Sequence, residues 1–430
     1  MTLPRKSVFW SVSFGHTMVD MFATIGPVLL AFMSVHVLPM TNTQIGFAVS
    51  AFQLCGALSQ PFFGMWADRT GGRWLGAAAV AWEVALVVLA MIVATVTGSY
   101  VLMLIPFILA SLGSGALHPI GTMHAAAADS LRVGRNLSIF FLMGQLGSSI
   151  GPIVIGALLD RFASNNAAFT AALGANFAGR LMETGSVLPA MAVGIIALPA
   201  AIWMALALPN SAAFGGRERR AAAERRAVLV KPLLILAAMV ALRSLASPGI
   251  VAFLPRLFQF KGWTAAEYGA ITSFYWLASG LAGVWFGTLA DRFGARGVIA
   301  VTLLLGAPTI FMLSVTDGVI AFAAALLAGG LTGGSHSLIV ATTQRLMPTG
   351  KGFASGMSLG FIFGAGALAT LALGALADRI GLIGAFQIAA AFTVGAGLLA
   401  WLLPSDKAGL AAEPHKPMTT AQTSPSAPGD

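Results

Sequence analysis

The chain has 430 residues, of which 57% are hydrophobic and 9% are charged, and it carries a formal net charge of +9. A soluble domain of this size needs a far more polar surface, so the composition excludes an ordinary soluble protein. The basic residues are spread between long apolar stretches instead of forming one patch, and we therefore expect no nucleic-acid partner.

The predicted elements are twelve apolar blocks, most of them long enough to cross the hydrocarbon core of a bilayer as a helix. In chain order the blocks cover residues 8–34, 43–67, 73–97, 100–126, 136–160, 187–208, 232–258, 266–290, 296–316, 319–346, 351–378 and 383–404. A transmembrane β-barrel would instead show short segments of alternating apolar and polar residues. We predict an all-α membrane protein whose twelve transmembrane helices form two six-helix bundles.

The order of the blocks divides the chain into four predicted parts. These are an N-terminal six-helix bundle (1–208), a basic linker (209–231), a C-terminal six-helix bundle (232–404) and a disordered tail (405–430). Most Lys and Arg residues lie on alternate connections, in the linker and at the termini. The positive-inside rule then places both termini in the cytoplasm. The first block is too long for a signal peptide and should remain as the first helix.

The two halves of the chain repeat one another. Residues 41–52 match residues 264–275 at an offset of 223, and at that offset the pattern G-x-x-x-D-R closes both the second and the eighth block. The same pattern closes the fifth and eleventh blocks, which leave the membrane on the opposite face. The four copies begin at Gly64, Gly156, Gly287 and Gly374. This arrangement predicts three-helix units in inverted pairs.

The turn after the second block resembles the signature G-x-x-x-D-R-x-G-R-R of the major facilitator superfamily of transporters. The matching residues are Gly64, Asp68, Arg69, Gly71 and Arg73. Gly72 stands where a basic residue is usual. The second copy of the turn supplies Gly287, Asp291, Arg292 and Arg296. The resemblance covers residues 8–404 and implies a carrier that works by alternating access.

The segment GSSIGPIVIG at the end of the fifth block resembles a motif typical of proton-coupled exporters in this superfamily. Its residues are Gly147, Gly151, Pro152 and Gly156. Small residues at this spacing predict a close helix–helix contact, and the resemblance implies that this contact keeps protons from leaking through the empty carrier.

Three further segments resemble the fosmidomycin-resistance branch of bacterial efflux proteins. They are SFGHTMVD, GSGALHPIGT and SIFFLMGQLGSSIGP. The resemblance implies a location in the bacterial cytoplasmic membrane. That branch usually has Gln and Asn where this chain has Phe141 and Gln145, which we take as candidate substrate-binding residues.

Three charged side chains lie deep inside apolar blocks, away from the block ends, where each charge costs at least about 2.5–3.5 kcal/mol and so needs an explanation. They are Asp20, Glu83 and Arg243. At the offset of 223, Asp20 and Arg243 occupy equivalent positions, which predicts that they face one another across a central cavity. Asp20 could exchange a proton, and Arg243 could bind a carboxylate, phosphate or phosphonate. A static ion pair between the halves is the alternative.

Histidines add further candidates for proton and substrate contacts. His16 precedes Asp20 by four residues, so both should share one helical face. His16 could pass protons to the carboxylate, or it could simply be hydrogen-bonded within the bundle. Glu83 is a further candidate for proton coupling, with packing as the alternative. His118 and its counterpart His336 could contact substrate, or they could bond backbone carbonyls that a bent helix leaves free.

The aspartates of the two signature turns lie at the C-terminal ends of helices, where the helix dipole disfavours a carboxylate. Each should therefore have a partner, either the arginine at the end of its own turn or the start of a helix from the opposite half. That helix start is near residues 351–355 for Asp68 and near residues 135–138 for Asp291. We predict a latch that closes the cytoplasmic side, and a solvated turn that serves only topology is the alternative.

These features predict a secondary active transporter, more narrowly a proton-coupled antiporter that exports small anionic compounds or drugs. The chain has no P-loop, so ATP should not drive transport, and no HExxH or CxxC spacing that would indicate a metal site. We expect no enzyme activity and no cofactor, protons and a small molecule as partners, and function as a monomer in the lipid bilayer. Two alternatives remain, a symporter that imports an organic anion and a membrane receptor or scaffold without transport.

Overall fold

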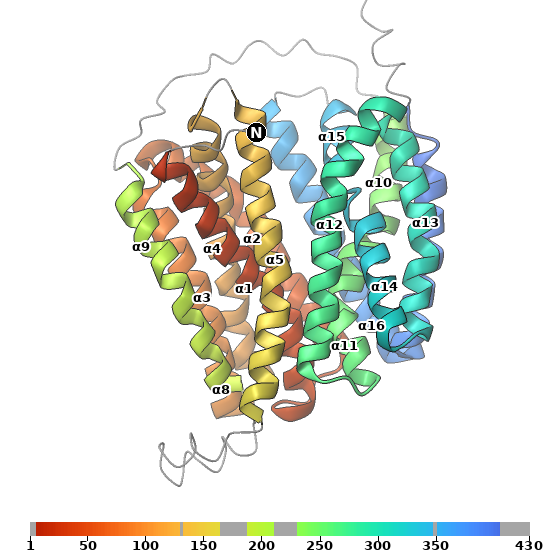
Figure 1. Cartoon of the computed structure of the whole chain (residues 1–430), viewed down its shortest axis with the longest axis horizontal. Helices are drawn as coiled ribbons and strands as arrows, with labels where there is room; N and C mark the ends of the chain where they lie inside the picture. The colour runs from red at the N-terminus through yellow and green to blue at the C-terminus, as the bar shows by residue number, and fades with distance from the viewer. Residues whose placement is uncertain (1–5, 130–131, 164–186, 210–229, 347–350, 405–430) are drawn as a thin grey trace, which may run out of the picture.

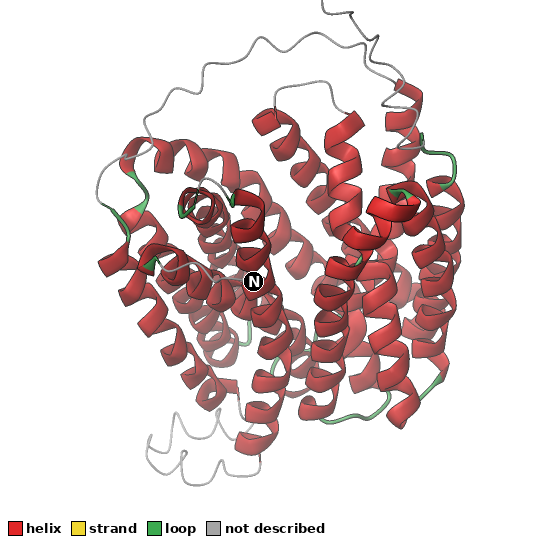
Figure 2. Ribbon diagram, turned by 45° about the horizontal axis from the view of Figure 1, so that its top comes forward, coloured by secondary structure: helices red, strands yellow, loops and turns green. Residues whose placement is uncertain are grey.

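The structure is a computed structural model that describes residues 6–129, 132–163, 187–209, 230–346 and 351–404. Every regular element in these ranges is a helix (Figures 1 and 2). The elements before the predicted linker are α1 (Ser7–His36), α2 (Asn42–Thr70), α3 (Arg73–Thr97), α4 (Tyr100–Ala127), α5 (Val133–Ala163), α8 (Val187–Ala190), η1 (Met191–Ala197) and α9 (Leu198–Ala207). The elements after it are α10 (Val230–Ser244), η2 (Leu245–Gly249), α11 (Ile250–Phe260), α12 (Ala265–Phe293), α13 (Ala295–Val315), α14 (Gly318–Ala328), η3 (Gly329–Gly333), α15 (His336–Leu346) and α16 (Lys351–Ala400). The predicted tail and nearly all of the predicted linker lie outside the described residues.

Within the described ranges, nine helices are long and apolar enough to cross a membrane. Three more segments match the remaining predicted blocks. They are α12, the shorter apolar stretch Met191–Ala207, and the end of α16 beyond the left-handed Gly381 (φ 82°), which divides α16 into two helices. Each predicted block falls on a helix whose ends differ from the prediction by no more than four residues. The predicted all-α membrane fold is confirmed.

The helices before and after the linker pack as two groups that stand side by side (Figure 1). We call the face where α1 begins the N-terminal face. The opposite face, where α1 ends and α2 begins, is called the far face. Helices α5 and α12 pack against each other along one side of the boundary between the groups, and α2 packs against α16 along the other.

The two halves meet at the far face and part toward the N-terminal face. Near the far face, the Ile153 backbone N–H donates to the Ser273 hydroxyl at 2.9 Å, and the Ser50 hydroxyl donates to the Ala367 carbonyl at 2.6 Å. All the buried residues of α12, and all those of α2 except Ala67, lie in the first half of the helix, whereas the second halves, toward the N-terminal face, are mostly exposed. Contact between the halves is therefore concentrated at one face.

The signature turns lie at the N-terminal face, and their arginines bond within their own half. The Arg73 Nε donates to the Ala205 carbonyl in the last turn of α9. The Arg296 guanidinium donates to the Leu403 carbonyl at 3.2 Å, just beyond α16. A positive charge is favoured at the carboxyl end of a helix, which explains both contacts.

The aspartates of these turns do not pair with the arginines that the sequence suggested. Asp68 and Asp291 are exposed, and neither bonds to another residue in the described part of the chain. The ion pairs with Arg73 and Arg296 are therefore absent, because those arginines bond to carbonyls instead. The side chains of residues 351–360 are outside the described set, so the latch expected for Asp68 stays a prediction.

Local geometry explains why glycine occupies position 72, where the signature usually has a basic residue. Gly71 and Gly72 both adopt a left-handed conformation with φ 76°. A Cβ at Gly72 would also lie 3.2 Å from two carbons of the Ile120 side chain. Glycine relieves both constraints and lets the turn pack closely against α4.

Candidate functional site

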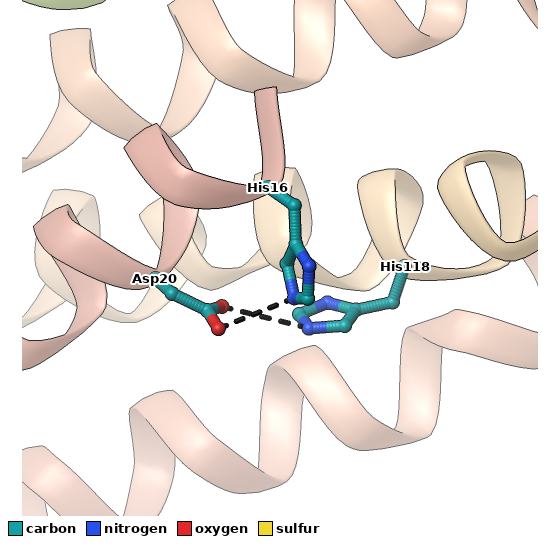
Figure 3. Close-up of side chains that lie close together, drawn as sticks. All are labelled: His16, Asp20 and His118. Carbon is teal, nitrogen blue, oxygen red and sulfur yellow. Dashed lines mark ion pairs between the residues drawn. The ribbon is translucent and has the colours of Figure 1, made fainter. Parts of the chain in front are cut away.

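The N-terminal half contains a cluster of two imidazoles and one carboxyl group, formed by His16, Asp20 and His118 (Figure 3). His16 and Asp20 lie one turn apart on α1, and His118 comes from α4. His16 Nε2 is 3.2 Å from Asp20 Oδ2, and His118 Nε2 is 3.6 Å from Asp20 Oδ1. The predicted contact between His16 and Asp20 is confirmed, and His118 joins the same group.

The second nitrogen of each imidazole faces a backbone carbonyl. His16 Nδ1 is 2.9 Å from the Phe140 oxygen, and His118 Nδ1 is 2.8 Å from the Ser114 oxygen. Because a carbonyl oxygen only accepts, each Nδ1 carries a hydrogen, and each neutral ring then has a lone pair on Nε2. Without a further proton, the Nε2 lone pairs of both rings face the ionised Asp20 carboxylate, which can only accept hydrogen bonds. A proton between Asp20 and an imidazole turns that repulsive contact into a hydrogen bond. The arrangement can therefore hold one or two protons.

The three facing side chains also meet the spacing requirement for a larger cation. One potential ligand atom from each lies within 4.8 Å of the other two. The expected absence of a metal site rested on local motifs, and a group assembled from two helices has no such motif. A proton satisfies the same lone pairs without recruiting a fourth ligand, which a tetrahedral metal ion would need.

Helix α5 forms the wall behind the cluster. The Phe140 ring stacks on the His16 ring with centroids 4.2 Å apart and an interplanar angle of 16°. A Cβ at Gly144, one turn later, would lie 2.5 Å from Asp20 Oδ2. His16 is only 2% exposed, whereas Asp20 and His118 keep 19% and 25% of their side-chain exposure. Protein thus covers His16 and leaves the carboxyl group and His118 partly open.

Glu83 lies on α3, which packs against both α4 and α1, and it is fully buried. Neither carboxyl oxygen has a hydrogen-bond partner among the described residues. Helix α4 is pressed against it, since a Cβ at Gly113 would lie 2.7 Å from the Glu83 Cβ. A buried carboxyl group without partners is costly, so this residue needs an explanation beyond filling space.

Arg243 lies in the C-terminal half, in the last turn of α10, and is 2% exposed. Its Nη2 donates to the Thr332 carbonyl of η3 at 2.8 Å, and its Nε has no partner among the described residues. Within those residues, no ion pair joins Arg243 to Asp20 or to another acid. The alternative of a static ion pair between Asp20 and Arg243 is therefore absent from this conformation, because each side chain is bonded within its own half. That the two residues face one another across a central cavity stays a prediction.

Two further residues of the C-terminal half lie near Arg243. His336, the first residue of α15, is partly buried and close enough to interact electrostatically with the guanidinium. The Tyr275 hydroxyl is 3.1 Å from the Thr332 hydroxyl and 3.3 Å from that of Ser247. Sequence reasoning missed Tyr275, because its counterpart in the repeat is the apolar Phe52 and the alignment drew attention only to charged positions.

Phe141 and Gln145, the positions that depart from the resembled branch, lie in different surroundings. Phe141 is 50% exposed, and its ring centroid is 6.1 Å from that of His16. Gln145 is partly buried at the boundary between the halves, where a Cβ at Gly280 of α12 would lie 3.1 Å from the Gln145 Cβ. Phe141 therefore borders the cluster, whereas Gln145 faces the opposite half.

The small residues of the exporter-like motif make two different contacts. A Cβ at Gly147 or Gly151 would collide with the backbone of α1. Gly156 lies against the first turn of α12, and the Pro152 carbonyl lies against Gly269 of the same helix. The predicted close helix–helix contact is confirmed, and it involves both halves.

Several residues of the cluster carried no chemical signal in the sequence. Phe140 and Ser114 contribute backbone carbonyls, and Gly144 contributes the absence of a side chain. A motif search looks for reactive side chains and overlooks such roles. The regular spacing of Gly144, Gly147 and Gly151 was the one available indication that this face of α5 is packed closely.

Comparisons with known proteins agree with this architecture. The family model of the Major Facilitator Superfamily matches residues 9–261 and 233–427. The chain is 27% identical over 372 residues to an uncharacterized MFS-type transporter, YfnC, of Bacillus subtilis (strain 168), covering 86% of each chain. It is 25% identical over 415 residues to the fosmidomycin resistance protein of Escherichia coli (strain K12), covering 93% of each.

Solved structures share the fold at low sequence identity. A bacterial homolog of the human lysosomal transporter Spinster, in an inward-facing and occupied conformation, superimposes with a TM-score of 0.75 at 15% identity, covering 94% of this chain and 97% of that one. A D-xylose–proton symporter superimposes with a TM-score of 0.68 at 14% identity, covering 94% and 98%. The chain therefore belongs to the major facilitator superfamily of membrane transporters.

Proposed function

We propose that this protein is a proton-coupled antiporter that exports small anionic compounds across the bacterial cytoplasmic membrane. The observation that carries the proposal is the His16–Asp20–His118 cluster, in which both Nε2 atoms face one carboxyl group while both Nδ1 atoms are committed to carbonyls. Imidazoles change charge near neutral pH, so such a site can take up and release protons without moving the helices around it. Glu83, buried without partners, is a second candidate for proton uptake.

The anionic substrate class rests on Arg243. Its guanidinium is buried without a described acid beside it, and a guanidinium can bind a carboxylate, phosphate or phosphonate through two parallel hydrogen bonds. We assign His118, His336, Phe141 and Gln145 to the same substrate region. Similarity to a protein named for fosmidomycin resistance supports export as the direction.

The proposed orientation places the N-terminal face in the cytoplasm, because most basic residues lie on connections at that side. The halves, assigned to residues 1–208 and 232–404, then meet at the outer side, and the conformation is inward-facing. Similarity to a transporter solved in an inward-facing conformation supports this assignment. We further propose that the monomer is the working unit.

Direction of transport is the point that separates the proposal from a symporter. An antiporter changes conformation with either protons or substrate bound, whereas a symporter changes conformation with both bound or with neither. Purified protein in liposomes loaded with fosmidomycin, or with a panel of phosphonates and carboxylates, is diluted into acidic buffer. We expect external acid to accelerate loss of the internal compound. Acceleration of uptake instead would identify a symporter, and absence of both fluxes and of counterflow would indicate a receptor or scaffold.

The role of Asp20 is tested in the same liposomes with Asp20→Asn. The amide of Asn cannot bind a proton at the pH values of the experiment. We therefore expect gradient-driven efflux to be lost while substrate counterflow remains. His124→Gln is the matched control, because His124 also lies buried on α4 but bonds to the Gly71 carbonyl at 2.9 Å, outside the cluster. Efflux by Asp20→Asn at the rate of the control would contradict the proposal.

A divalent metal ion is the competing occupant of the cluster. Transport that is unchanged by EDTA supports protons. Loss of transport on chelation, with recovery on adding a divalent ion, would assign the cluster to a metal instead.

A further inference from the structure

The far face contains a carboxylate from one half that caps a helix of the other half. Asp160, near the end of α5, accepts two backbone hydrogen bonds from the start of α12. Its Oδ1 is 3.0 Å from the Ala265 nitrogen, and its Oδ2 is 2.8 Å from the Ala266 nitrogen. These N–H groups belong to the first turn of α12 and have no partner within that helix.

A second carboxylate makes the same contact in the opposite direction. Asp378 of α16 accepts from the Asn42 nitrogen at 2.9 Å and from the Thr43 nitrogen at 2.8 Å, with a third bond from the Thr43 hydroxyl at 2.5 Å. At the repeat offset of 223, Asn42 and Thr43 correspond to Ala265 and Ala266. The two contacts are therefore equivalent positions of one internal repeat.

Helix dipoles explain why both contacts are favourable. Each aspartate lies at the carboxyl end of its own helix, where a negative charge is disfavoured. The amino end of the facing helix supplies unpaired N–H groups and a partial positive charge, so the carboxylate is stabilised by the other half. Separation of the halves removes this stabilisation at both places together.

A glycine one turn before each aspartate permits the approach. A Cβ at Gly156 would collide with the Ala265 carbonyl, and a Cβ at Gly374 would lie 2.5 Å from the Asn42 carbonyl. The spacing G-x-x-x-D thus has a direct physical meaning at this face. The glycine lets the helix start come close, and the aspartate caps it.

The same spacing occurs at the N-terminal face, where it is not engaged with any described residue of the opposite half; a Cβ at Gly64 would meet only Pro119 of its own half, at 3.4 Å. Asp68 and Asp291 are exposed, and a Cβ at Gly287 would meet no atom within 4 Å. Within the described part of the chain, one pair of G-x-x-x-D motifs is therefore engaged across the halves while the equivalent pair is free.

We propose that Asp160 and Asp378 form the gate that closes the far face, and that this gate must release in each transport cycle when the N-terminal-face motifs engage. The two pairs of motifs then hold the two alternate conformations of one carrier. The inference rests on transport by alternating access as proposed above. Both aspartates are positioning residues, because they act on the halves and touch no substrate.

The gate is tested by labelling a cysteine that only an open far face exposes. Ser50 is 4% exposed at the boundary between the halves, so Ser50→Cys in a Cys55→Ala background is the reporter. A membrane-impermeant maleimide is added at the far side. We expect Asp160→Asn and Asp378→Asn each to raise the labelling rate by about tenfold, the ratio that 1.4 kcal/mol produces, and the double variant to raise it further.

Asp317→Asn is the matched control, because Asp317 also caps a helix start, accepting from the Gly318 nitrogen at 2.9 Å, but within its own half. Its labelling rate should equal that of the parent. A double variant that labels at this control rate would overturn the gate. Labelling needs neither substrate nor a proton gradient, so failure of the gate is distinguishable from failure of the transport proposal.

A second variant removes the donor and keeps both carboxylates. Ala265 is the first residue of α12, where proline is well tolerated, and the preceding Thr264 already has the extended conformation (φ −71°, ψ 164°) that proline requires. Ala265→Pro deletes one N–H that Asp160 accepts and leaves the bonds within α12 intact. We expect faster labelling of the reporter with no loss of thermal stability, and a parental rate would count against the gate.

Discussion

Asp20 contacts imidazoles and no guanidinium or ammonium group among the described residues, so its charge state depends on partners that can themselves gain or lose a proton. A carboxylate held by an arginine would instead stay ionised over the whole physiological range. The cluster is therefore suited to gaining and losing protons, whereas a static Asp20–Arg243 ion pair, the alternative raised by the repeat, would not be.

Gly144→Ala tests whether the geometry of the cluster matters, since it changes no titratable group. The added methyl group would lie 2.5 Å from Asp20 Oδ2, so the carboxyl group must move away from the imidazoles. Because a misplacement of about 1 Å can cost 10²-fold in rate, we expect gradient-driven efflux to fall by about that factor and its pH profile to shift. The rate of efflux is measured against pH.

Gly297→Ala serves as the control for this experiment, because a Cβ at Gly297 would meet no atom within 4 Å. It should leave both rate and pH profile unchanged. A parental pH profile for Gly144→Ala would show that the closeness of α5 to the carboxyl group is incidental.

Glu83→Gln tests whether the buried acid carries a proton through the cycle. The amide has the size of the carboxyl group and cannot exchange a proton, so we expect nearly unchanged thermal stability but fewer protons moved per substrate. The ratio is obtained from the pH gradient that just stops net flux of substrate. An unchanged ratio would assign Glu83 to packing alone.

At the scale of single residues, the sequence predicted which side chains lie near the candidate site better than it predicted which residues they contact. The four-residue spacing of His16 and Asp20 fixes their contact, because it lies within one helix. The contact with His118 depends on how α4 packs against α1, and the equivalence of Asp20 and Arg243 in the repeat gives equal depth in the two halves and not proximity. Local spacing was therefore informative, whereas contacts between helices required the structure.

Among the elements, α5 takes part in both the cluster and the boundary between the halves. Gly147 and Gly151 face α1, Phe140 and Gly144 cover the cluster, and Asp160 at its end caps α12. A change in α5 should therefore affect proton retention as well as stability.

Gly151→Ala tests the proposed seal against proton leakage. The methyl group would lie 2.5 Å from the Met21 carbonyl, and overpacking of this kind costs about 1–3 kcal/mol. We expect a lower midpoint of thermal unfolding in detergent and a faster proton leak through liposomes without substrate. A lower unfolding midpoint with an unchanged proton leak would show that Gly151 contributes to packing and not to a seal against protons.

Element boundaries were predictable, but irregular turns inside helices were not. Pro119 directly follows His118, yet α4 continues through this proline from Tyr100 to Ala127. The wide π-helical turns lie instead at η2 and η3, which contain Pro248 and three glycines respectively. Whether a helix continues through a proline or widens at glycines depends on neighbouring helices that can take up the freed backbone groups.

For the whole molecule, composition and repeats were sufficient to predict the fold but not the conformation. Apolar block lengths fix where helices cross a membrane, and the G-x-x-x-D-R copies reveal the inverted repeat. In the proposed alternating-access cycle, the same sequence satisfies both an inward-facing and an outward-facing arrangement, so no pattern within it favours one. Which conformation is present follows from which G-x-x-x-D motifs are engaged, and this can be seen only in the contacts between the two halves.

If the proposed gate opens in each cycle, the capped helix starts at the far face also form a composite surface that exists in one state only. Residues 41–43 meet Asp378 there, and residues 264–266 meet Asp160, so each site is assembled from both halves. A protein that binds the helix start and the capping aspartate of one such site would hold the two halves together from the aqueous side. It would arrest the carrier without entering the membrane or competing with the transported compound, which makes this surface a target for state-specific inhibition.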